Sequence, residues 1–439
     1  MTLRLGCIAD DFTGATDLAN NLVRAGMRVV QLNGMPEAGA PPVEANVDAV
    51  VVALKSRTIA PADAVAQSLA ACRFLKGGGA TQIYFKVCST FDSTPRGNIG
   101  PVLEALMDAL DCRFTIATPA FPDNGRTVFK GHLFVGDVLL SESGMRNHPL
   151  TPMTDANLVR VLQAQLATTR GPGAVPRRVG LVDHRTVGAS SAAIVERFRS
   201  LEQGGVAIAI ADAVANDDLL RLGTAVKDLP LVCAGSGLAI GLPANFGISA
   251  SSESASLPPV GGFRAIVSGS CSEATNAQVA AFISAGRAAH RIDPLALASG
   301  GDAGVVAAIA RWADERWAEQ PEQPVLVYST AAPNDVAAAQ QQGGAHDVGA
   351  RLEAILAAAA VALVGRGVRR LVVAGGETSG ACVQALGVET LRIGAQIDPG
   401  VPATATVGTQ PLALALKSGN FGTTDFFEKA LRHLNGAAQ

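Results

Sequence analysis

The sequence predicts an α/β protein of two domains, each a mostly parallel sheet flanked by helices. Short, almost continuously apolar runs alternate with longer helical patterns, which is typical of strands that helices cover on both faces. Only 4% of the 439 residues are aromatic, whereas Gly (47) and Pro (23) are frequent. This composition favours aliphatic cores with many short elements over an aromatic-rich β-sandwich. A Ser-rich segment without periodicity divides the chain into two unequal parts.

The predicted strands are β-branched runs that each end at a turn. Because a turn and a helical stretch follow most of them, we expect parallel pairing. They are, in chain order, Leu5–Ala9, Ala49–Leu54, Gln82–Val87, Phe114–Ala117, Arg178–Val182, Val206–Ala211, Leu231–Ala234, Arg264–Val267, Val325–Tyr328 and Arg370–Ala374.

The Ser-rich segment at residues 247–262, GISASSESASLPPVGG, is predicted to be a linker, because it lacks periodicity and ends in proline and glycine pairs. It separates a first domain, residues 1–246, from a second, residues 263–439. Open α/β sheets bind their ligands at the carboxyl ends of the strands, and two-domain proteins often bind them between domains. We therefore expect an active site in the interdomain cleft.

The charge and cysteine content exclude several classes of protein. With 35 Lys+Arg against 38 Asp+Glu and no dense basic run, nucleic acid is not an expected partner. The longest apolar stretch, Ala354 to Val364, is too short to cross a hydrocarbon core of about 30 Å, and the start lacks an apolar leader, so we expect a cytoplasmic protein. The 7 cysteines show no paired spacing that predicts disulfides or zinc.

Two aspartates directly follow the first predicted strand. Asp10 and Asp11 come after Leu5–Ala9, and a helix is expected to begin near Thr13. Carboxylates at a strand end, beside helix N-terminal amides, can take a proton from a hydroxyl or bind a cation. The alternative is a helix N-cap with a solvated acid, and Asp17 is expected on the face of the helix.

A loop rich in hydroxyl groups follows the predicted strand Gln82–Val87. It contains Lys86, Ser89, Thr90 and Asp92 within a few residues. Short hydroxyls and a lysine at a strand end suit an anionic ligand with several hydroxyl groups. The alternative is a Ser/Thr turn that leads into a helix near residue 99.

A third polar segment, TPAFPDNGR, ends at Arg126 after two prolines and an Asn-Gly turn. Arg126 could clamp a carboxylate with two hydrogen bonds, or it could be an ordinary surface arginine. His132 and His148 follow it without partners at a catalytic spacing, so we predict structural roles for both.

The segment GSGLAIG, residues 235–241, invites a dinucleotide-binding interpretation. Its spacing is longer by one residue than the fingerprint requires, and no second strand with a terminal acid follows. We predict a strand-to-helix turn in which small residues allow close packing.

Three glycine turns in the second part each follow an apolar run: VSGSCS at 267–272, AGGETSG at 374–380 and LKSGNFG at 416–422. Glycine at a strand-to-helix turn exposes backbone N–H groups and lets phosphate oxygens approach closely. The chain has no GxxxxGK[ST] motif. The three turns together predict a nucleotide-phosphate site of another kind.

The motifs together resemble the four-carbon acid sugar kinase family, over about residues 4 to 432. The resemblance is carried, in chain order, by IADDFTGATD, YFKVCSTFDSTPRGNIGPV, TPAFPDNGRTV, LLSESGMRNHPLTPMTD, VSGSCSEATNAQV, VVAGGETSGA and LKSGNFG. It implies an N-terminal substrate-binding domain, a C-terminal nucleotide-binding domain, and transfer of phosphate from ATP, with Mg²⁺, to the terminal hydroxyl of an acid sugar. The expected acceptor is 3-oxo-tetronate, with D-threonate or D-erythronate as alternatives.

The resemblance also implies a set of site residues. Expected in catalysis are Asp10, Asp11 and Lys86, and in substrate binding Ser89, Thr90, Asp92 and Arg126. Expected in ATP binding are Ser268, Ser270, Gly375, Gly376, Glu377, Thr378, Ser379 and Gly419. The metal ligands stay unassigned.

In the resulting hypothesis, Asp10 or Asp11 orients or deprotonates the 4-hydroxyl, while Lys86 and Arg126 hold the substrate carboxylate or the developing phosphoryl charge. Two other function classes stay open. One is an oxidoreductase of hydroxy acids that uses GSGLAIG for a dinucleotide, and the other is a non-catalytic sugar-acid sensor. The expected partners are a small acid sugar and ATP, with self-association into a homo-oligomer left open.

Overall fold

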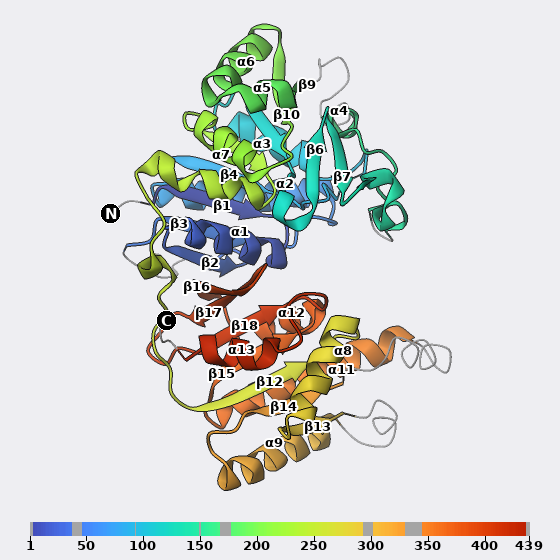
Figure 1. The fold of residues 1–439 in the computed structure, drawn as a ribbon, viewed down its shortest axis with the longest axis vertical. Helices are drawn as coiled ribbons and strands as arrows, with labels where there is room; N and C mark the ends of the chain where they lie inside the picture. Colours follow the sequence, from blue (N-terminus) through green and yellow to red (C-terminus); the bar gives the residue numbers. More distant parts are fainter. Residues whose placement is uncertain are drawn as a thin grey trace. The chain divides into compact units, whose positions relative to one another are not determined.

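The computed structural model describes residues 3–36, 46–92, 94–148, 151–166, 177–292, 302–329 and 345–435. The chain forms two compact units, Met1–Ser254 and Ala255–Gln439 (Figure 1). The boundary falls within residues 247–262, where Ser252–Ala255 forms a single 3-10 turn. Substrate binding by the first unit and nucleotide binding by the second stay predictions.

The sheet of the first unit is parallel throughout its described strands, in the order β2-β3-β1-β4-β11-β5-β10-β9. The strands are β1 (Leu5–Ala9), β2 (Val29–Asn33), β3 (Ala49–Ala53), β4 (Gln82–Lys86), β5 (Thr115–Thr118), β9 (Arg178–Val182), β10 (Val206–Ala211) and β11 (Leu231–Ala234). The helices are α1 (Phe12–Arg24), α2 (Pro61–Gly77), α3 (Ile99–Ala109), α4 (Leu158–Leu166), α5 (His184–Ala189), α6 (Ser191–Gln203) and α7 (Asn216–Ala225).

The central strands form because their residues are apolar on both faces. All five residues of β1 and of β3 are buried, and helices α1 and α2 pack against β1. In the parallel register Ala9 of β1 pairs with Ala53 of β3 and with Lys86 of β4. Three segments that are distant in sequence therefore end side by side at one edge of the sheet.

A small antiparallel sheet of β6 (Arg126–Phe129), β7 (His132–Val135) and β8 (Val138–Leu139) follows β5. It is attached to the end of β10 through Asp212, whose carboxylate accepts the N–H groups of Lys130 and Gly131 at 2.7 and 2.8 Å. His132 contacts Asn157 and His148 contacts Thr151, which agrees with structural roles for both histidines.

The second unit has the strand order β13-β14-β12-β15-β18-β17-β16. The first five strands in this order, β13, β14, β12, β15 and β18, are parallel to one another. β17 and β16 form an antiparallel hairpin, in which β17 pairs with β18. The strands are β12 (Phe263–Ser268), β13 (Ala288–Arg291), β14 (Val325–Tyr328), β15 (Val368–Ala374), β16 (Thr390–Asp398), β17 (Val401–Thr406) and β18 (Ala413–Lys417). The helices are α8 (Glu273–Ser284), α9 (Asp302–Glu319), α11 (Ala345–Gly365), α12 (Gly376–Ala385) and α13 (Phe426–His433).

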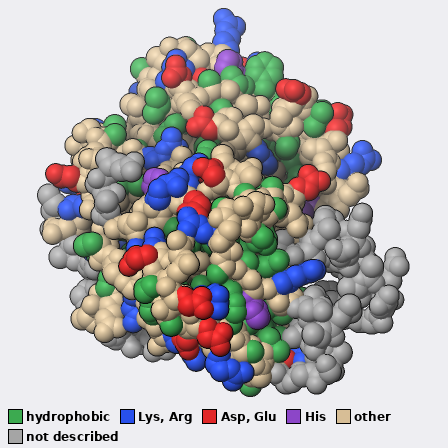
Figure 2. Space-filling view, turned by 60° about the horizontal axis from the view of Figure 1, so that its bottom comes forward, with side chains coloured by type: hydrophobic (Ala, Val, Ile, Leu, Met, Phe, Trp, Pro, Cys, Tyr) green, Lys and Arg blue, Asp and Glu red, His purple; other side chains and the backbone are tan. Residues whose placement is uncertain are grey.

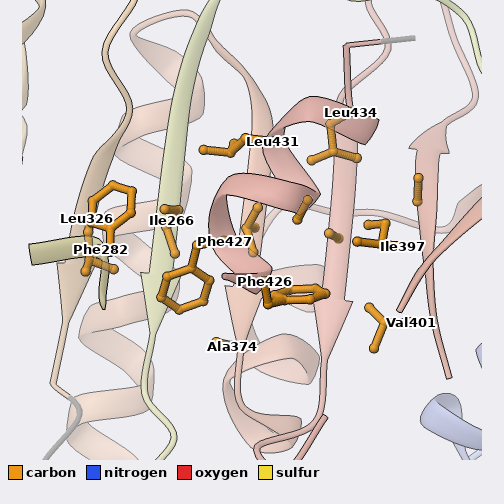
Figure 3. Close-up of a cluster of buried hydrophobic side chains, with 14 of the residues drawn as sticks. Ile266, Phe282, Leu326, Ala374, Ile397, Val401, Phe426, Phe427, Leu431 and Leu434 are labelled. Atoms are coloured by element: carbon orange, nitrogen blue, oxygen red, sulfur yellow. The ribbon is translucent and has the colours of Figure 1, made fainter. Parts of the chain in front are cut away.

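A buried cluster in the second unit fastens α8 and α13 to the sheet (Figure 3). Phe282 of α8 meets Phe427 of α13 edge to face, with ring centroids 6.2 Å apart. Ile266 and Leu326 of the sheet belong to the same cluster. Because α8 begins directly after the turn that follows β12, this packing also fixes the position of that turn.

The predicted fold class, mostly parallel sheets flanked by helices, is confirmed. On the face drawn in Figure 2, basic and acidic side chains are interspersed, without a broad patch of one sign. No helix in the described part of the chain is both long enough and apolar enough to cross a membrane.

Candidate active site

Charged residues follow three neighbouring strands of the first unit. Asp10 follows β1, Lys86 ends β4, and Arg57 lies a few residues beyond β3. The Asp10 N–H donates to the Lys86 carbonyl at 3.2 Å, and the Arg57 N–H donates to the Asp10 carbonyl at 3.2 Å. The parallel register thus collects these residues at the carboxyl edge of the sheet.

Arg57, which was not predicted, is the centre of this cluster. Its Nε and Nη2 bond the two carboxylate oxygens of Asp10 at 3.0 and 2.8 Å, and Nη2 also bonds Asp11 at 2.7 Å. Its Nη1 lies 3.7 Å from the Asp92 carboxylate. The planar guanidinium suits such a pairing, in which two parallel bonds fix one carboxylate.

The loop that carries Arg57 is held by one buried amide. Asn98, which directly precedes α3, donates through Nδ2 to the carbonyls of Ser56, Arg57 and Ile59 at 2.7, 3.2 and 2.9 Å. Since both ends of this short loop are bonded to the same side chain, the backbone beneath Arg57 has little freedom.

The turn after β4 supplies the third carboxylate. Buried Phe91 has φ +52, a left-handed conformation that costs a non-glycine residue about 1–3 kcal/mol. This turn brings the Thr90 hydroxyl within 2.5 Å of Asp92 Oδ1, and Cys88 Sγ lies 3.0 Å from the same hydroxyl. Ser89 is half-buried in this turn.

A glycine lets α1 approach the cluster. Lys86 is buried, and a Cβ atom at Gly14 would lie under 3.0 Å from both Lys86 Nζ and Asp11 Oδ1. Asp11 is the N-cap of α1 and accepts the Gly14 N–H at 3.1 Å. Any larger residue at position 14 would therefore displace the lysine or the N-cap.

The two aspartates differ in the direction of their pKa shifts and in solvent access. Burial acts to raise the pKa of Asp11, but the charges of Lys86 and Arg57 outweigh it and lower that pKa, so Asp11 is ionised at neutral pH. Burial raises the pKa of Asp10, and Arg57 offsets only part of this. The side chain of Asp11 is 27% exposed against 6% for Asp10, so Asp11 is the more accessible acceptor.

Asp17 joins α1 to the turn after β11. Its carboxylate accepts the Ser236 hydroxyl, and Asn21 Nδ2 donates to the Ser236 carbonyl at 3.0 Å. Burial raises the pKa of Asp17.

Ser236 belongs to the GSGLAIG segment, where a Cβ at Gly235 would lie 2.8 Å from the Pro119 carbonyl oxygen. These contacts agree with a packing role for the glycines.

Within the described part of the chain, Arg126 forms no hydrogen bond or ion pair with the carboxylates around Arg57. It begins β6, and its Nη1 donates to the Asn124 carbonyl. Among the described residues its buried Nε has no partner. A role in substrate binding thus stays a prediction for Arg126.

The three predicted glycine turns meet in the second unit. Ser268 pairs with Ala374, and Ala374 pairs with Lys417, so the ends of β12, β15 and β18 lie side by side. A Cβ at Gly269 would lie under 3.0 Å from Thr378 Oγ1, and one at Gly419 would lie as close to Ser270 Oγ. Only glycine permits such close approach between the turns.

The N-terminus of α12 has the features of an anion site. Gly375 precedes it with φ +131 and provides no side-chain cap, which leaves the first amides available to a ligand. A Cβ at Gly376 would meet only Ser418 Oγ, at 3.9 Å, so the space above it is open. The buried Ser379 Oγ has no partner among the described residues. Exposed Glu377 and buried Thr378 complete this turn.

The turn after β12 is organised by hydroxyl groups. Ser272 caps α8 by accepting the Thr275 N–H at 3.2 Å, and it donates to the Gly419 carbonyl at 2.6 Å. Lys417, a second residue that was not predicted, donates to Thr275 Oγ1 at 2.8 Å and to the Gly419 carbonyl at 3.0 Å. These bonds join the first glycine turn to the third.

Comparison with known proteins identifies both units. Residues 5–242 match the model of a sugar-binding N-terminal domain, and residues 265–427 match that of a nucleotide-binding C-terminal domain. The 3-oxo-tetronate kinases of Cupriavidus necator and Burkholderia multivorans are 56% and 58% identical over 98% and 99% of this chain and 97% and 98% of theirs. The chain belongs to the four-carbon acid sugar kinase family.

A solved structure agrees with this family assignment. A crystal structure from Salmonella typhimurium LT2 has a TM-score of 0.88 and 43% sequence identity, over 98% of this chain and 99% of that one. As a member of the acid sugar kinase family the chain is a small-molecule kinase. The Asp10–Arg57 cluster falls within the sugar-binding match and the glycine turns fall within the nucleotide-binding match.

Proposed function

We propose that this protein transfers the γ-phosphate of ATP to the 4-hydroxyl of 3-oxo-tetronate, giving ADP and 3-oxo-tetronate 4-phosphate. The observation that carries the proposal is the 56–58% identity to 3-oxo-tetronate kinases over nearly the whole chain. The runner-up is a D-threonate or D-erythronate 4-kinase of the same family. We place the reaction in the cytoplasm, where ATP is supplied, with small molecules as the partners.

In this proposal Asp11 orients the 4-hydroxyl. Both Asp10 oxygens are engaged by Arg57, whereas among the described residues Asp11 Oδ2 accepts only the Thr13 hydroxyl, at 3.3 Å. The lowered pKa of Asp11 makes it a permanent acceptor at neutral pH. Phosphoryl transfer through a loose transition state depends on positioning more than on proton removal, so an ionised aspartate suits the task.

We assign Lys86 to the substrate carboxylate or to the transferring phosphoryl group. Its ammonium group lies beside the first turn of α1 and lowers the pKa of Asp11. Ser89, Thr90 and Asp92 are assigned to the substrate hydroxyls. Thr90 and Asp92 already bond each other, so the substrate would have to share or replace that bond.

We assign the ATP phosphates to the three glycine turns. The open space over Gly376, the uncapped amides of α12 and the unpartnered Ser379 hydroxyl support this assignment. The residues proposed for ATP are Ser268, Ser270, Gly375, Gly376, Glu377, Thr378, Ser379 and Gly419. Because the acceptor and the γ-phosphate must meet, an active site shared by the two units stays part of the proposal.

The proposal includes Mg²⁺, which would neutralise phosphate charge during transfer. The described residues contain no group of three or more His, Cys, Asp or Glu side chains that could hold a metal ion. This fits Mg²⁺ that is carried mainly by the phosphates of ATP, with one or two protein carboxylates at most. Glu377, in the first turn of α12, is the carboxylate that we assign to it.

A phosphorylation screen tests the choice of substrate. We expect kcat/KM for 3-oxo-tetronate to exceed that for D-threonate, L-threonate and D-erythronate by about 10²-fold or more, because a site built for one pattern of oxygens leaves polar groups unpaired with the others. ADP release measures the rates. Preference for D-threonate or D-erythronate would favour the runner-up, and equal rates on all four acids would contradict a single-substrate assignment.

The substitution Asp11→Asn tests the mechanism. It retains the shape of the side chain and removes its charge, so we expect turnover to fall about 10²- to 10⁴-fold while ADP binding is unchanged. Asp155→Asn is the matched control, since Asp155 pairs with Arg160 at an exposed site. Normal turnover of Asp11→Asn would remove Asp11 from the mechanism.

A further inference from the structure

Lys417 is a buried lysine without a charged partner. It ends β18 with 1% of its surface exposed, and it forms an ion pair with no described carboxylate. Its Nζ donates to Thr275 Oγ1 at 2.8 Å and to the carbonyls of Ser418 and Gly419 at 3.1 and 3.0 Å. The Phe426 ring, 5.9 Å from Nζ, adds a weak cation–π contact. A buried ammonium group that lacks a negative partner is costly.

The three hydrogen bonds of Lys417 use every donor of its ammonium group, so the lysine is placed to act through its neighbours. The Gly419 carbonyl accepts from Lys417, from Ser272 Oγ at 2.6 Å and from Thr275 Oγ1 at 2.8 Å. Ser272 and Thr275 lie at the N-terminus of α8, and Gly419 lies in the third glycine turn. The lysine therefore binds together two of the turns that we assign to the phosphates.

We propose that Lys417 is a positioning residue of the nucleotide site, which fixes the Gly419 turn against α8. The phosphates of the nucleotide neutralise its uncompensated charge. Nucleotide binding is therefore coupled to protonation of this lysine. The proposal rests on the nucleotide site of the proposed function. In this proposal Lys417 does not contact the nucleotide; it acts through its positive charge and by holding the glycine turns in place.

Burial lowers the pKa of Lys417 to about 8, so about half of the free protein carries a neutral Lys417 at that pH. Phosphates nearby favour the ammonium form and raise the pKa, hence binding takes up a proton. Affinity should be constant well below pH 8. Above it, affinity should fall by up to tenfold per pH unit until the pKa of the bound state is reached.

Several other titratable groups lie on the elements around Lys417. Glu273 in the first turn of α8 and Glu377 in that of α12 are exposed. Asp398 beside α13 is held by Lys429 at 2.6 Å. The Cys271 thiol lies in the first glycine turn, and it requires a control of its own.

Calorimetry of the full chain tests the proposal. ADP with MgCl₂ is titrated at about pH 8 in buffers of different protonation enthalpy. At this pH the terminal phosphate of ADP, whose last pKa is about 6, is already ionised and takes up no proton. We expect wild type to take up about half a proton. Lys417→Met should take up none, bind ADP about tenfold more weakly at pH 7, and lose the pH dependence of affinity.

Matched variants separate the lysine from its surroundings. Lys429→Met removes the ammonium group that Asp398 neutralises in the same unit, and Cys271→Ser removes the nearby thiol; both should retain the wild-type uptake. Lys417→Gln is a second variant that keeps a hydrogen-bonding side chain, and circular dichroism checks that each variant is folded. The wild-type measurement does not depend on the folding of any variant.

Each outcome decides one point. ADP binding to wild type without proton uptake overturns the role of Lys417 while the proposed function stands. Uptake that persists in Lys417→Met, or vanishes in Cys271→Ser, overturns it likewise. Failure of wild type to bind ADP contradicts the nucleotide site itself, and with it both proposals.

Discussion

The side chain of Arg57 balances three carboxylates in the first unit. It bonds Asp10 and Asp11 and lies within ion-pair distance of Asp92. Lys86 is the second cation of this cluster. Three carboxyl groups thus lie near two basic groups, and without Arg57 they would lie near only one, Lys86. Like charges this close raise one another's pKa.

We predict that Arg57→Met lowers kcat/KM about 10²-fold or more, since a shift of about 1 Å in a positioned group has effects of that size. Because the acid pKa values rise, the acidic limb of the pH–rate profile should move to higher pH. ADP affinity should not change. Arg160→Met, which removes an exposed ion pair with Asp155, is the control, and a wild-type pH profile in Arg57→Met would contradict this role.

The sequence predicted Asp10, Asp11, Lys86 and Asp92, but it did not predict Arg57. The available signal was the same in each case, a charged residue after an apolar strand. Arg57 was missed because it lies four residues beyond the end of β3, in a stretch without glycine or a run of hydroxyls. Its side chain reaches Asp10 because Asn98 holds the loop in one conformation. The local sequence around Arg57 does not indicate that conformation.

At the scale of elements, the glycine turns of the second unit depend on close approach. Gly375 combines φ +131 with a Cβ position 2.8 Å from Thr378 Oγ1. An alanine there would strain the backbone and push the turn away from its neighbour. Gly387, at the end of α12, has φ +62 but open space around its Cβ position. Comparing alanine substitutions at the two positions therefore separates the effect of backbone strain alone from the effect of strain combined with a close contact.

We predict that Gly387→Ala lowers the free energy of unfolding by about 1 kcal/mol, and that Gly375→Ala lowers it by more, because the close contact with Thr378 adds to the backbone strain. Only Gly375→Ala should weaken ADP binding, about tenfold or more, because hydrogen bonds to charged phosphates are lost. Thermal melts and ADP titrations measure the two effects. Equal ADP affinity in both variants would contradict the assignment of this turn to the phosphates.

The elements that the sequence predicted best are the buried parallel strands. β1, β9, β10, β11 and β14 have the expected bounds, and β3, β4, β5, β12 and β15 differ by one or two residues at their ends. No bounds were predicted for β2, β6, β7, β8, β13, β16, β17 and β18, although an apolar run was recognised before the turn that follows β18. Several of these are short or half-buried, and β16, with the pattern TLRIGAQID, carries polar residues. Their pairing is decided by neighbouring elements more than by their own composition.

At the scale of the whole molecule, the two units should respond to different ligands. We predict that ADP slows amide hydrogen exchange first at residues 268–272, 375–379 and 417–422, whereas the acid sugar slows it at 10–14, 55–58 and 86–92, because ligands protect the amides that they contact. Exchange of the full chain, followed by mass spectrometry, measures this. Protection by ADP of the first-unit segments alone would reverse the assignment of the units.

The two-unit organisation was predictable from composition, because a Ser-rich segment interrupts two α/β patterns, and the division at residues 254 and 255 lies in that segment. The family was predictable from its motifs. What the motifs could not indicate is how strand order brings them together. Asp10, Arg57 and Lys86 are neighbours because β1 lies between β3 and β4, and a strand order is a property of the whole sheet.

The strand order of the first unit also bears on how the chain folds as it is synthesised. β11, at residues 231–234, lies between β4 and β5, which precede it by more than a hundred residues, and Gln82 of β4 bonds the carbonyls of Val226 and Leu229 at 2.9 and 2.7 Å. At ribosomal rates of about 5–20 residues per second, β4 waits on the order of ten seconds for its partner. During that time two apolar strand edges lack their neighbour, so the interval of greatest exposure to aggregation falls before the first unit is complete.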